Sequence, residues 1–427
     1  MAPKLERVVS PGKGNGLRAA VRLRRGELVY SAEPLACCVS SKLCEDVCHH
    51  CFTRQEKLLR CSQCKTARYC NASCQKRAWP GHKTECRCLQ RLLPRTPTDS
   101  VRLAARLVLA SLSPSKGRSE ELYTLEEHES HLSSMSEQKK QGLSQLAAML
   151  EVYLQQEAEG RASLPSSCRD PLSLIAKVTC NCFTISDGEL QEVGVGLYPS
   201  LSLLNHDCRP NCVMVFEGTT LHLRAVREIN PEEELTISYI GTLLLTDERR
   251  VQLEEQYHFT CLCQRCESKD DDALMLAGDE AAWIKLKEAL PGLEALKAEC
   301  DWRSLSERCC RLLSAVGGDV PDENLYKLRM TDMALDACIH LGDWEEALRY
   351  GRTTLPAYRR YFPDPHPVHG VQLMRVGKLQ HYLEHTQDAL DTFKQAYQIL
   401  KLTHGGDHPL TTDLLMKLEE CRCVTDE

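Results

Sequence analysis

Cysteine and histidine residues between positions 48 and 86 are spaced as metal ligands. A C-x2-C pair lies on a tight turn from which both sulfurs reach one ion, and C-x3-C or H-x3-C places two ligands on one helical turn. The pairs are Cys48 and Cys51, Cys61 and Cys64, Cys70 and Cys74, and His82 and Cys86. Eight ligands complete two tetrahedral sites, so the spacing predicts two structural zinc ions with no open position for catalysis.

A second polar cluster lies at residues 205–212, where the sequence NHDCRPNC collects an amide, an imidazole, a carboxylate, a guanidinium and two thiols. This composition has three possible interpretations: a turn that binds a metal ion, a thiol nucleophile with its base, or a backbone crossing whose polar groups need side-chain partners. Downstream, Cys261, Cys263 and Cys266 are one ligand short of a tetrahedral site. Cys208 is the candidate fourth ligand, a role that leaves no free thiol for nucleophilic catalysis. A buried cysteine cluster without metal is the alternative.

Length and composition set the context for these clusters. With 427 residues, of which 42% are hydrophobic, the chain is long enough for about two to four domains. The first residues do not form a signal peptide, and we find no apolar run of membrane length. We therefore expect the cytoplasm or the nucleus, where 25 cysteines indicate metal ligands and not a disulfide framework.

Charge is unevenly distributed along the chain. Residues 1–95 carry 19 Lys and Arg against 7 Asp and Glu, although the net charge of the whole chain is −7. Lysine and arginine commonly form a solvated surface around small zinc modules. The other interpretation is an acidic or nucleic-acid partner near the N-terminus.

The predicted elements place the two clusters in one interrupted β domain. Gly12, Gly14 and Gly16 predict a hairpin turn before a β-type segment, and no Walker lysine-serine pair follows that would make a phosphate loop. Residues 95–175 have helical periodicity, and β-type alternation returns between residues 185 and 240. The domain that begins before the cysteine-rich insert therefore resumes after it.

The C-terminal third, from about residue 271, has helical periodicity and an internal repeat of 42 residues. The repeated dipeptides are Asp301-Trp302 and Asp343-Trp344, Pro321-Asp322 and Pro363-Asp364, Ala347-Leu348 and Ala389-Leu390, and His366-Pro367 and His408-Pro409. A common interval predicts stacked helical hairpins of the tetratricopeptide type, with units longer than the usual ~34 residues. Such a stack either binds an acidic peptide tail or walls a substrate groove.

Taken together, these motifs resemble the SET-and-MYND (SMYD) protein lysine methyltransferases over essentially the whole chain, most of all the third member of that family. The motifs that carry the resemblance are GNGLRA at 14–19, the insert at 48–86, LLNHDCRPN at 203–211, EEELTISY at 232–239 and CLCQRC at 261–266. The resemblance implies an α+β multidomain fold: a β-rich SET fold with a pseudoknot, split by a MYND zinc finger and followed by an all-α tetratricopeptide-like domain.

The domain boundaries that follow are the SET N-terminal half at 1–44, the MYND finger at 45–88, a helical SET insert at 89–175, the SET C-terminal half at 176–242, a post-SET zinc segment at 243–270 and the helical domain at 271–427. In SET folds the segment carrying Asn205 and His206 threads beneath the segment ending in Tyr239. Buried backbone at such a crossing needs short polar side chains as partners, which accounts for much of the composition of residues 205–212.

The resemblance also implies residue roles. In the MYND pattern the zinc sites interleave, so Cys48, Cys51, Cys70 and Cys74 hold one ion while Cys61, Cys64, His82 and Cys86 hold the other; Cys208, Cys261, Cys263 and Cys266 hold a third. The expected S-adenosylmethionine contacts are Lys13, Gly14, Asn15, Tyr123, His131, Asn205, His206, Tyr239 and Phe259. His131 stands where close relatives have asparagine, and it adds a group that titrates near pH 6.5. Tyr239 is the expected catalytic hydroxyl, with Phe183 and Tyr257 as aromatic walls of a lysine channel.

We therefore expect an S-adenosylmethionine-dependent methyltransferase acting on lysines of histones and of non-histone signalling proteins such as kinases, with three structural zinc ions. Expected partners are a heat-shock chaperone tail at the helical domain and a proline-rich peptide or DNA at the finger, with no membrane and a monomeric state. The alternatives are a non-catalytic adaptor that joins partners in transcriptional or chaperone complexes, and a zinc-dependent DNA-binding regulator. An intact cofactor clasp argues against the adaptor.

Overall fold

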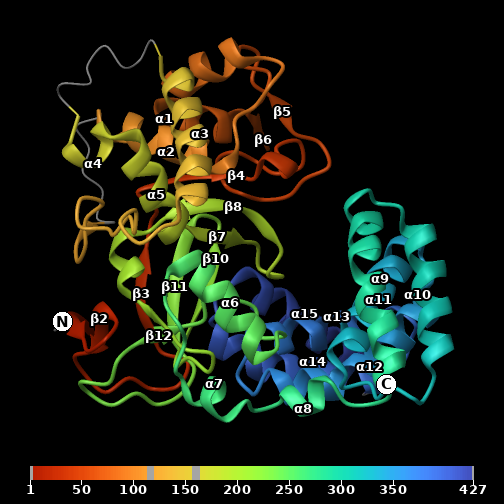
Figure 1. The fold of residues 1–427 in the computed structure, drawn as a ribbon. Coiled ribbons are helices and arrows are strands. Elements are labelled where there is room, and N and C mark those ends of the chain that lie inside the picture. The colour runs from red at the N-terminus through yellow and green to blue at the C-terminus, as the bar shows by residue number, and fades with distance from the viewer. Residues whose placement is uncertain (1–2, 113–119, 156–163, 426–427) are drawn as a thin grey trace.

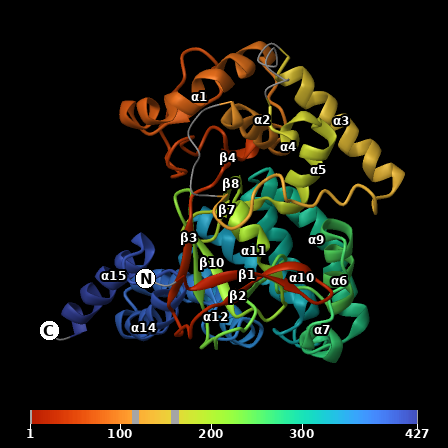
Figure 2. The same ribbon diagram turned by 90° about the vertical axis from the view of Figure 1, so that its left-hand side faces the viewer.

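The computed structural model describes residues 3–112, 120–155 and 164–425 (Figure 1). Figures 1 and 2 both place helices α1–α5 at one end of the strands and helices α12–α15 beside the other end. Among the described residues, no helix combines the length and the apolar character that crossing a membrane requires. The fold therefore has three parts: a central set of small sheets, a finger with its insert helices, and a helical C-terminal region.

The central strands come from both sides of the finger, as the interrupted β pattern predicts. They are β1 (Leu5–Ser10), β2 (Gly14–Ala19), β3 (Leu28–Ala32), β4 (Ala36–Val39), β7 (Phe183–Ser186), β8 (Glu192–Leu197), β9 (Asn205–His206), β10 (Cys212–Glu217), β11 (Thr220–Ala225) and β12 (Thr236–Ile237). The sheet orders are β10-β11-β3 and β4-β8-β7, with antiparallel pairs throughout. Strands β3 and β4, which precede the finger, thus pair with strands that follow it.

Strand β11 shows why these segments form sheets. Alternate residues Leu221, Leu223 and Ala225 are buried, while the residues between them are partly exposed. This period of two places one apolar face on the core and leaves the other face toward polar surroundings. Short 3-10 helices at Ser41–Leu43 (η1) and Pro199–Leu203 (η4) connect the strands.

The predicted backbone crossing is present at β9 and β12. These two-residue strands pair in parallel, with Asn205 opposite Thr236 and His206 opposite Ile237. The Asn211 side chain satisfies the nearby backbone, because its Oδ1 accepts from the Thr236 N–H at 2.8 Å and its Nδ2 donates to the Glu234 carbonyl at 2.8 Å. Short polar side chains therefore supply the hydrogen bonds that a two-residue ladder cannot.

The finger and the insert follow β4. Their elements are β5 (Leu59–Arg60), β6 (Arg68–Tyr69), α1 (Ala72–Leu92), α2 (Asp99–Ser111), α3 (Glu137–Tyr153), α4 (Ser166–Arg169) and α5 (Pro171–Asn181). Helix α1 begins inside the finger and continues beyond it, and helix α5 runs into the segment before β7. The predicted boundaries after residues 88 and 175 therefore fall within helices.

Helices dominate the chain after residue 245. They are α6 (Thr246–Tyr257), α7 (Gln264–Ser268), α8 (Asp272–Met275), α9 (Glu280–Ala298), α10 (Trp302–Val316), α11 (Leu325–Leu341), α12 (Trp344–Tyr361), α13 (Pro367–Tyr382), α14 (Thr386–Thr403) and α15 (Pro409–Thr425). The region docks on the central strands through polar contacts, for example from His408 Nε2 to the Phe216 carbonyl at 3.2 Å and from Lys378 Nζ to Glu189 at 2.7 Å.

The 42-residue repeat of the sequence is also a repeat of structure. Asn324, His366 and His408 stand at this interval, and each caps a helix by accepting a hydrogen bond from the backbone N–H two residues later. Cys300, Gly342 and Glu384 share the interval and the left-handed backbone conformation. Trp302 stacks on His340 and Trp344 packs on Tyr382, which are again equivalent positions. Each unit therefore begins, ends and contacts its neighbour in the same way.

Candidate functional site

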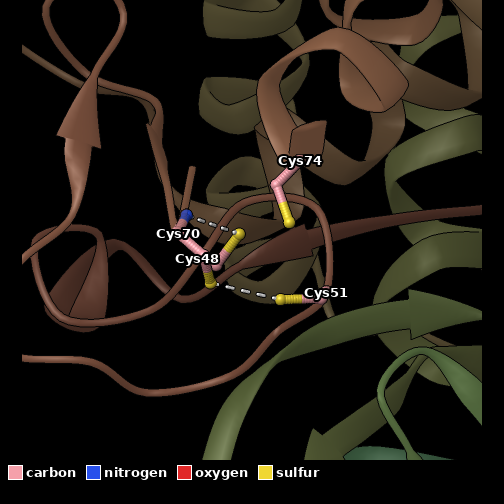
Figure 3. A group of neighbouring side chains, drawn as sticks. All are labelled: Cys48, Cys51, Cys70 and Cys74. Atoms are coloured by element: carbon pink, nitrogen blue, oxygen red, sulfur yellow. Dashed lines mark hydrogen bonds between the residues drawn. The ribbon is translucent and has the colours of Figure 1, made fainter. Parts of the chain in front are cut away.

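The first predicted zinc cluster is assembled from three short segments. Cys48 and Cys51 precede the finger strands, Cys70 follows β6, and Cys74 lies in the first turn of α1, where Asn71 caps the helix by accepting from the Cys74 N–H at 3.0 Å. Figure 3 shows the four sulfurs converging on one point. The sulfurs of Cys51 and Cys70 are 3.5 Å apart, close to the ~3.8 Å edge of a tetrahedron with zinc–sulfur bonds of about 2.3 Å.

The second cluster joins Cys61, Cys64, His82 and Cys86, all of them buried. The Cys61 and Cys86 sulfurs are 3.7 Å apart, and the Cys64 sulfur is 3.6 Å from His82 Nε2. Glu85 lies 3.8 Å from the other ring nitrogen of His82, where a carboxylate orients a metal-binding imidazole. The first set has four thiols and the second has three thiols and an imidazole, and both suit zinc. The side chains are grouped as the interleaved assignment predicts, and zinc ligation by each of them stays a prediction.

The third cluster brings Cys208 together with the three downstream cysteines, as its predicted role of fourth ligand requires. Its sulfur lies 3.5 Å from that of Cys266, and Cys261 and Cys263 complete the group. Arg249 donates from Nη2 to the Cys266 sulfur at 3.6 Å, an arrangement that favours a thiolate ligand. This cluster holds residues 205–208 against residues 261–266, which brings the crossing and the post-SET segment to one place.

A cavity of about 550 Å³ opens beside the third cluster. Of the residues predicted to bind the cofactor or to act in catalysis, those that line it are Lys13, His131, Asn205, His206, Tyr239, Tyr257 and Phe259. They come from the glycine turn, the insert, the crossing and the post-SET segment. Their individual roles stay predictions, and their convergence on one cavity is a feature of the tertiary structure.

His206 connects the cavity with the metal cluster. Its Nδ1 accepts from the Tyr239 backbone N–H at 3.0 Å, and its Nε2 lies 3.3 Å from the Cys208 sulfur. Because Nδ1 is an acceptor, the neutral ring carries its proton on Nε2 and donates to sulfur. Burial lowers the pKa of His206 to about 4, which agrees with a neutral ring.

Aromatic rings pack around the ring of Tyr239. The Tyr239 ring is 4.7 Å from that of Tyr257 and meets Phe259 edge to face at 6.3 Å. Its hydroxyl donates to the Leu204 carbonyl. Burial, together with the nearby Tyr257 and Glu234, raises the pKa of Tyr239, and burial raises the pKa of Tyr257 to about 12. Both hydroxyls are therefore neutral near pH 7 and act as hydrogen-bonding groups instead of bases.

Four predicted residues lie outside the lining of this cavity. Gly14 and Asn15 begin β2, and the Asn15 carbonyl accepts from Asn205 Nδ2 at 3.1 Å. The buried ring of Tyr123 stacks on His128, and its hydroxyl donates to the Glu127 carbonyl. Phe183, in β7, packs edge to face on Tyr198. Cofactor and channel roles for these residues stay predictions.

The cavity also contains residues that sequence reasoning missed. They are Pro11, Gly12, Cys180, Asn181, Asp207, His258, Thr260 and Leu262, besides the zinc ligands Cys261 and Cys263. Asp207 lies inside the polar motif NHDCRPNC, whose composition already indicated a functional site. Cys180 and Asn181, at the end of α5, belong to no motif that would have indicated a role. His258 faces His131 with ring centroids 5.0 Å apart, and Lys139 Nζ lies 3.3 Å from its Nε2.

Comparisons with known proteins identify two regions of the chain and relatives that cover nearly all of it. A MYND finger model matches residues 48–86, and a tetratricopeptide repeat model matches residues 330–402. Histone-lysine N-methyltransferase SMYD3 of Mus musculus is 47% identical over 420 residues, 98% of either chain, and SMYD3 of Homo sapiens is 47% identical over 98% of this chain and 97% of its own. N-lysine methyltransferase SMYD2 of Homo sapiens is 35% identical over 97% of this chain and 98% of its own.

A solved structure is also similar, the SET domain of LSMT bound to lysine and AdoHcy. It is 14% identical with a TM-score of 0.31, over 98% of this chain and 95% of that one. A score this low carries no structural argument.

Proposed function

The chain belongs to the SMYD family of protein lysine methyltransferases, and we propose that it transfers the methyl group of S-adenosylmethionine to lysines of histones and of non-histone signalling proteins. The observation that carries this proposal is the cavity in which Asn205, His206 and Tyr239 meet the glycine turn. A non-catalytic adaptor would have no need for that convergence.

The residues present fit the cofactor. Gly12 lines the cavity with φ of +74°, and no heavy atom lies within 4 Å of where its side chain would begin, so the turn leaves open space for a ligand. The walls combine an ammonium, an amide and an imidazole with aromatic rings. This mixture suits a molecule with an amino-acid end and a purine end.

When bound, S-adenosylmethionine supplies an electrophilic methyl group on a sulfonium. The chain's contribution is alignment and exclusion of water. The rings of Tyr239, Tyr257 and Phe259 provide an apolar wall that favours the neutral form of a substrate amine. The same rings tolerate the methylated cation through cation–π attraction. The neutral Tyr239 hydroxyl orients the amine without removing its proton.

The experiment that tests this function measures transfer of labelled methyl from S-adenosylmethionine to histones and extract proteins. Tyr239→Phe should keep S-adenosylhomocysteine affinity within about tenfold and lose most turnover. Tyr198→Phe is the matched control, because it also removes a buried hydroxyl bonded to a carbonyl, that of Thr219 at 2.6 Å. Near-normal turnover of Tyr239→Phe would defeat its role, and absence of S-adenosylhomocysteine binding to the wild type would favour the adaptor.

We propose further that the helical region binds an acidic peptide such as a chaperone tail. A second cavity of about 550 Å³, between α12, α13 and α14, is lined by Arg352, Arg359 and Arg360 and floored by Leu355 and Leu373. Arg352 pairs with Asp388 at 2.5 Å and Arg360 with Asp271 at 3.0 Å, so an acidic segment would compete with these carboxylates for the two guanidinium groups. Arginine walls over an apolar floor suit a short acidic segment with one apolar side chain. Arg359→Glu should weaken binding of such a labelled peptide by at least tenfold, and unchanged affinity would exclude this groove.

For the finger we propose a proline-rich peptide or DNA as partner, since Lys57, Arg60, Lys65, Lys76, Arg77 and Lys83 are all exposed. A steep salt dependence of DNA affinity would favour DNA, and its absence would favour the peptide. We propose further that the enzyme is a monomer and that it works in both nucleus and cytoplasm, the two compartments in which histones and signalling proteins act.

A further inference from the structure

Glu234 holds together the polar wall of the cofactor cavity. Its Oε1 accepts from Ser10 Oγ at 2.6 Å and from Asn205 Nδ2 at 2.8 Å, while its Oε2 accepts from Lys13 Nζ at 2.8 Å. Lys13 and Asn205 both line the cavity, although they are 192 positions apart in the sequence. One carboxylate thus links the glycine turn to the backbone crossing.

The backbone of Glu234 is itself anchored. Its carbonyl accepts from Asn211 Nδ2 at 2.8 Å, and the residue forms an antiparallel bridge with Arg18 of β2. Gly16 packs directly against the network, since a Cβ there would lie 2.5 Å from Ser10 Oγ and 2.9 Å from Asn205 Nδ2. The carboxylate therefore has little freedom to move away from its partners.

These hydrogen bonds determine the orientation of the Asn205 amide. The amide nitrogen contacts the Asn15 carbonyl at 3.1 Å and the Glu234 carboxylate at 2.8 Å. Both partners only accept hydrogen bonds, so the amide must present its two N–H groups to them. This commits both donors and leaves Oδ1 as the atom with which Asn205 can accept a hydrogen bond from a ligand.

We propose that Glu234 is a positioning residue for the cofactor: it fixes the Asn205 amide with Oδ1 as acceptor and holds Lys13 beside it, so that this wall selects a ligand offering an N–H or O–H donor. The inference rests on the proposed methyltransferase function and assigns the selection to a residue outside the cavity lining. The amine and ribose hydroxyls of S-adenosylmethionine and S-adenosylhomocysteine are donors of this class.

The test is calorimetric titration of zinc-loaded full-length protein with S-adenosylhomocysteine. Glu234→Gln should raise its Kd by about 10- to 100-fold, because a charge-assisted hydrogen bond and an ion pair are lost. Glu233→Gln is the matched control, since this neighbour pairs with Arg227 instead and its side chain is 28% exposed against 27% for Glu234. The control should change the Kd by less than twofold, with zinc content and melting temperature close to wild type in both.

Kinetics separate positioning from a general structural role. The KM for S-adenosylmethionine should rise in Glu234→Gln, while the KM for the protein substrate and the kcat change by less than about threefold. Equal losses in all three constants, or an S-adenosylhomocysteine Kd within twofold of wild type, would overturn the proposal. A wild-type protein that binds no S-adenosylhomocysteine would overturn the proposed function itself, before any variant is compared.

An exchange of side chains tests the direct hydrogen bond and does not depend on the single variant folding well. Asn205→Asp alone places two carboxylates together and should weaken S-adenosylhomocysteine binding severely. Combined with Glu234→Gln it restores one donor and one acceptor, so the double variant should bind more tightly than Asn205→Asp alone. A double variant that binds more weakly than Asn205→Asp would show that the two side chains act independently, against the proposal.

Discussion

The zinc finger (residues 48–86) and the helical repeats (residues 301–425) bury their interiors by different means. The finger interior includes many of its own metal ligands, among them Cys61, Cys64 and Cys86. The repeats bury leucine, alanine and aromatic side chains between successive helices, for example Phe393 against α13. A module of under 45 residues has too little apolar surface to fold without the ion, whereas stacked helices gain core with each unit.

The two regions also attach to their surroundings differently. Glu85 of α1 is fully buried, and its Oε1 accepts from Arg102 Nη2 of α2 at 3.0 Å. Burial opposes ionisation of this carboxyl, yet Arg102 and Arg106 hold its pKa well below the usual range. The repeats instead pack on one another through apolar side chains, and their ion pairs, such as Arg352 with Asp388, lie near the surface. Removing one zinc ion or one partner of the buried ion pair should therefore unfold the finger, whereas a single substitution in the repeats should lower their unfolding free energy only in part.

Removal of zinc is the largest expected effect on this contrast. Structural zinc supplies on the order of 10 kcal/mol of folding free energy per site, so chelation should unfold the finger and leave the repeats folded. Hydrogen exchange should show lost protection in residues 48–86 and retained protection in α11–α14. Chelator presaturated with zinc is the control. If the amides of residues 48–86 stayed protected in protein with no measurable zinc, the finger would not depend on the metal for folding and this contrast with the repeats would be wrong.

Breaking the buried ion pair is the next largest effect. Arg102→Met leaves Glu85 buried and without its closest partner, which should cost about 3–5 kcal/mol of unfolding free energy in urea denaturation. Arg106→Met is the control, because Arg106 lies 3.8 Å from Glu85 and its side chain is 22% exposed. Equal losses in the two variants would show that net charge, and not the buried pair, joins α1 to α2.

A glycine-to-alanine substitution should lower the unfolding free energy in the repeats and raise it in the helix beside the finger. At Gly377 of α13 a Cβ would meet Phe393 Cδ1 at 2.5 Å, so Gly377→Ala should destabilise the repeats by about 1–3 kcal/mol. At Gly142 of α3 no heavy atom lies within 4 Å, and Gly142→Ala should stabilise by about 0.5–1 kcal/mol through helix propensity. Thermal unfolding measures both, and a shared sign would contradict the packing argument.

The smallest expected effect concerns a cap within the repeats. Burial lowers the pKa of His366 from 6.5 to about 4, so folding favours the neutral ring. Its stabilisation is complete above pH 6.5 and is lost as pH falls toward 4, by about 1.4 kcal/mol at pH 5.5. His366→Asn adopts the capping residue of the equivalent position Asn324, and it should remove this dependence. Parallel unfolding profiles of wild type and variant between pH 4 and 7 would contradict the assignment.

Much of the finger and of the repeats was predictable because the relevant spacing is short or periodic. Two or three residues separate paired ligands, so local backbone geometry alone brings Cys61 to Cys64. The 42-residue interval likewise marks the repeat units in the sequence, independently of their caps and stacked rings. The hydrogen bonds of the cofactor wall were harder to predict. Glu234 lies in the EEELTISY motif, but its partners Ser10 and Lys13 lie more than 200 positions away in the sequence.

The sequence by itself therefore determined the grouping of the cysteine and histidine pairs, the interrupted SET fold and the helical repeat, since local geometry and hydrophobic periodicity depend on near neighbours. Tertiary structure decided which of the predicted side chains share a cavity, placing His131 and Phe259 there and leaving Tyr123 and Phe183 outside its lining. It also decided the orientation of the Asn205 amide. The physical reason is that an amide is oriented by the acceptors around it, and folding brings those acceptors from residues 15 and 234.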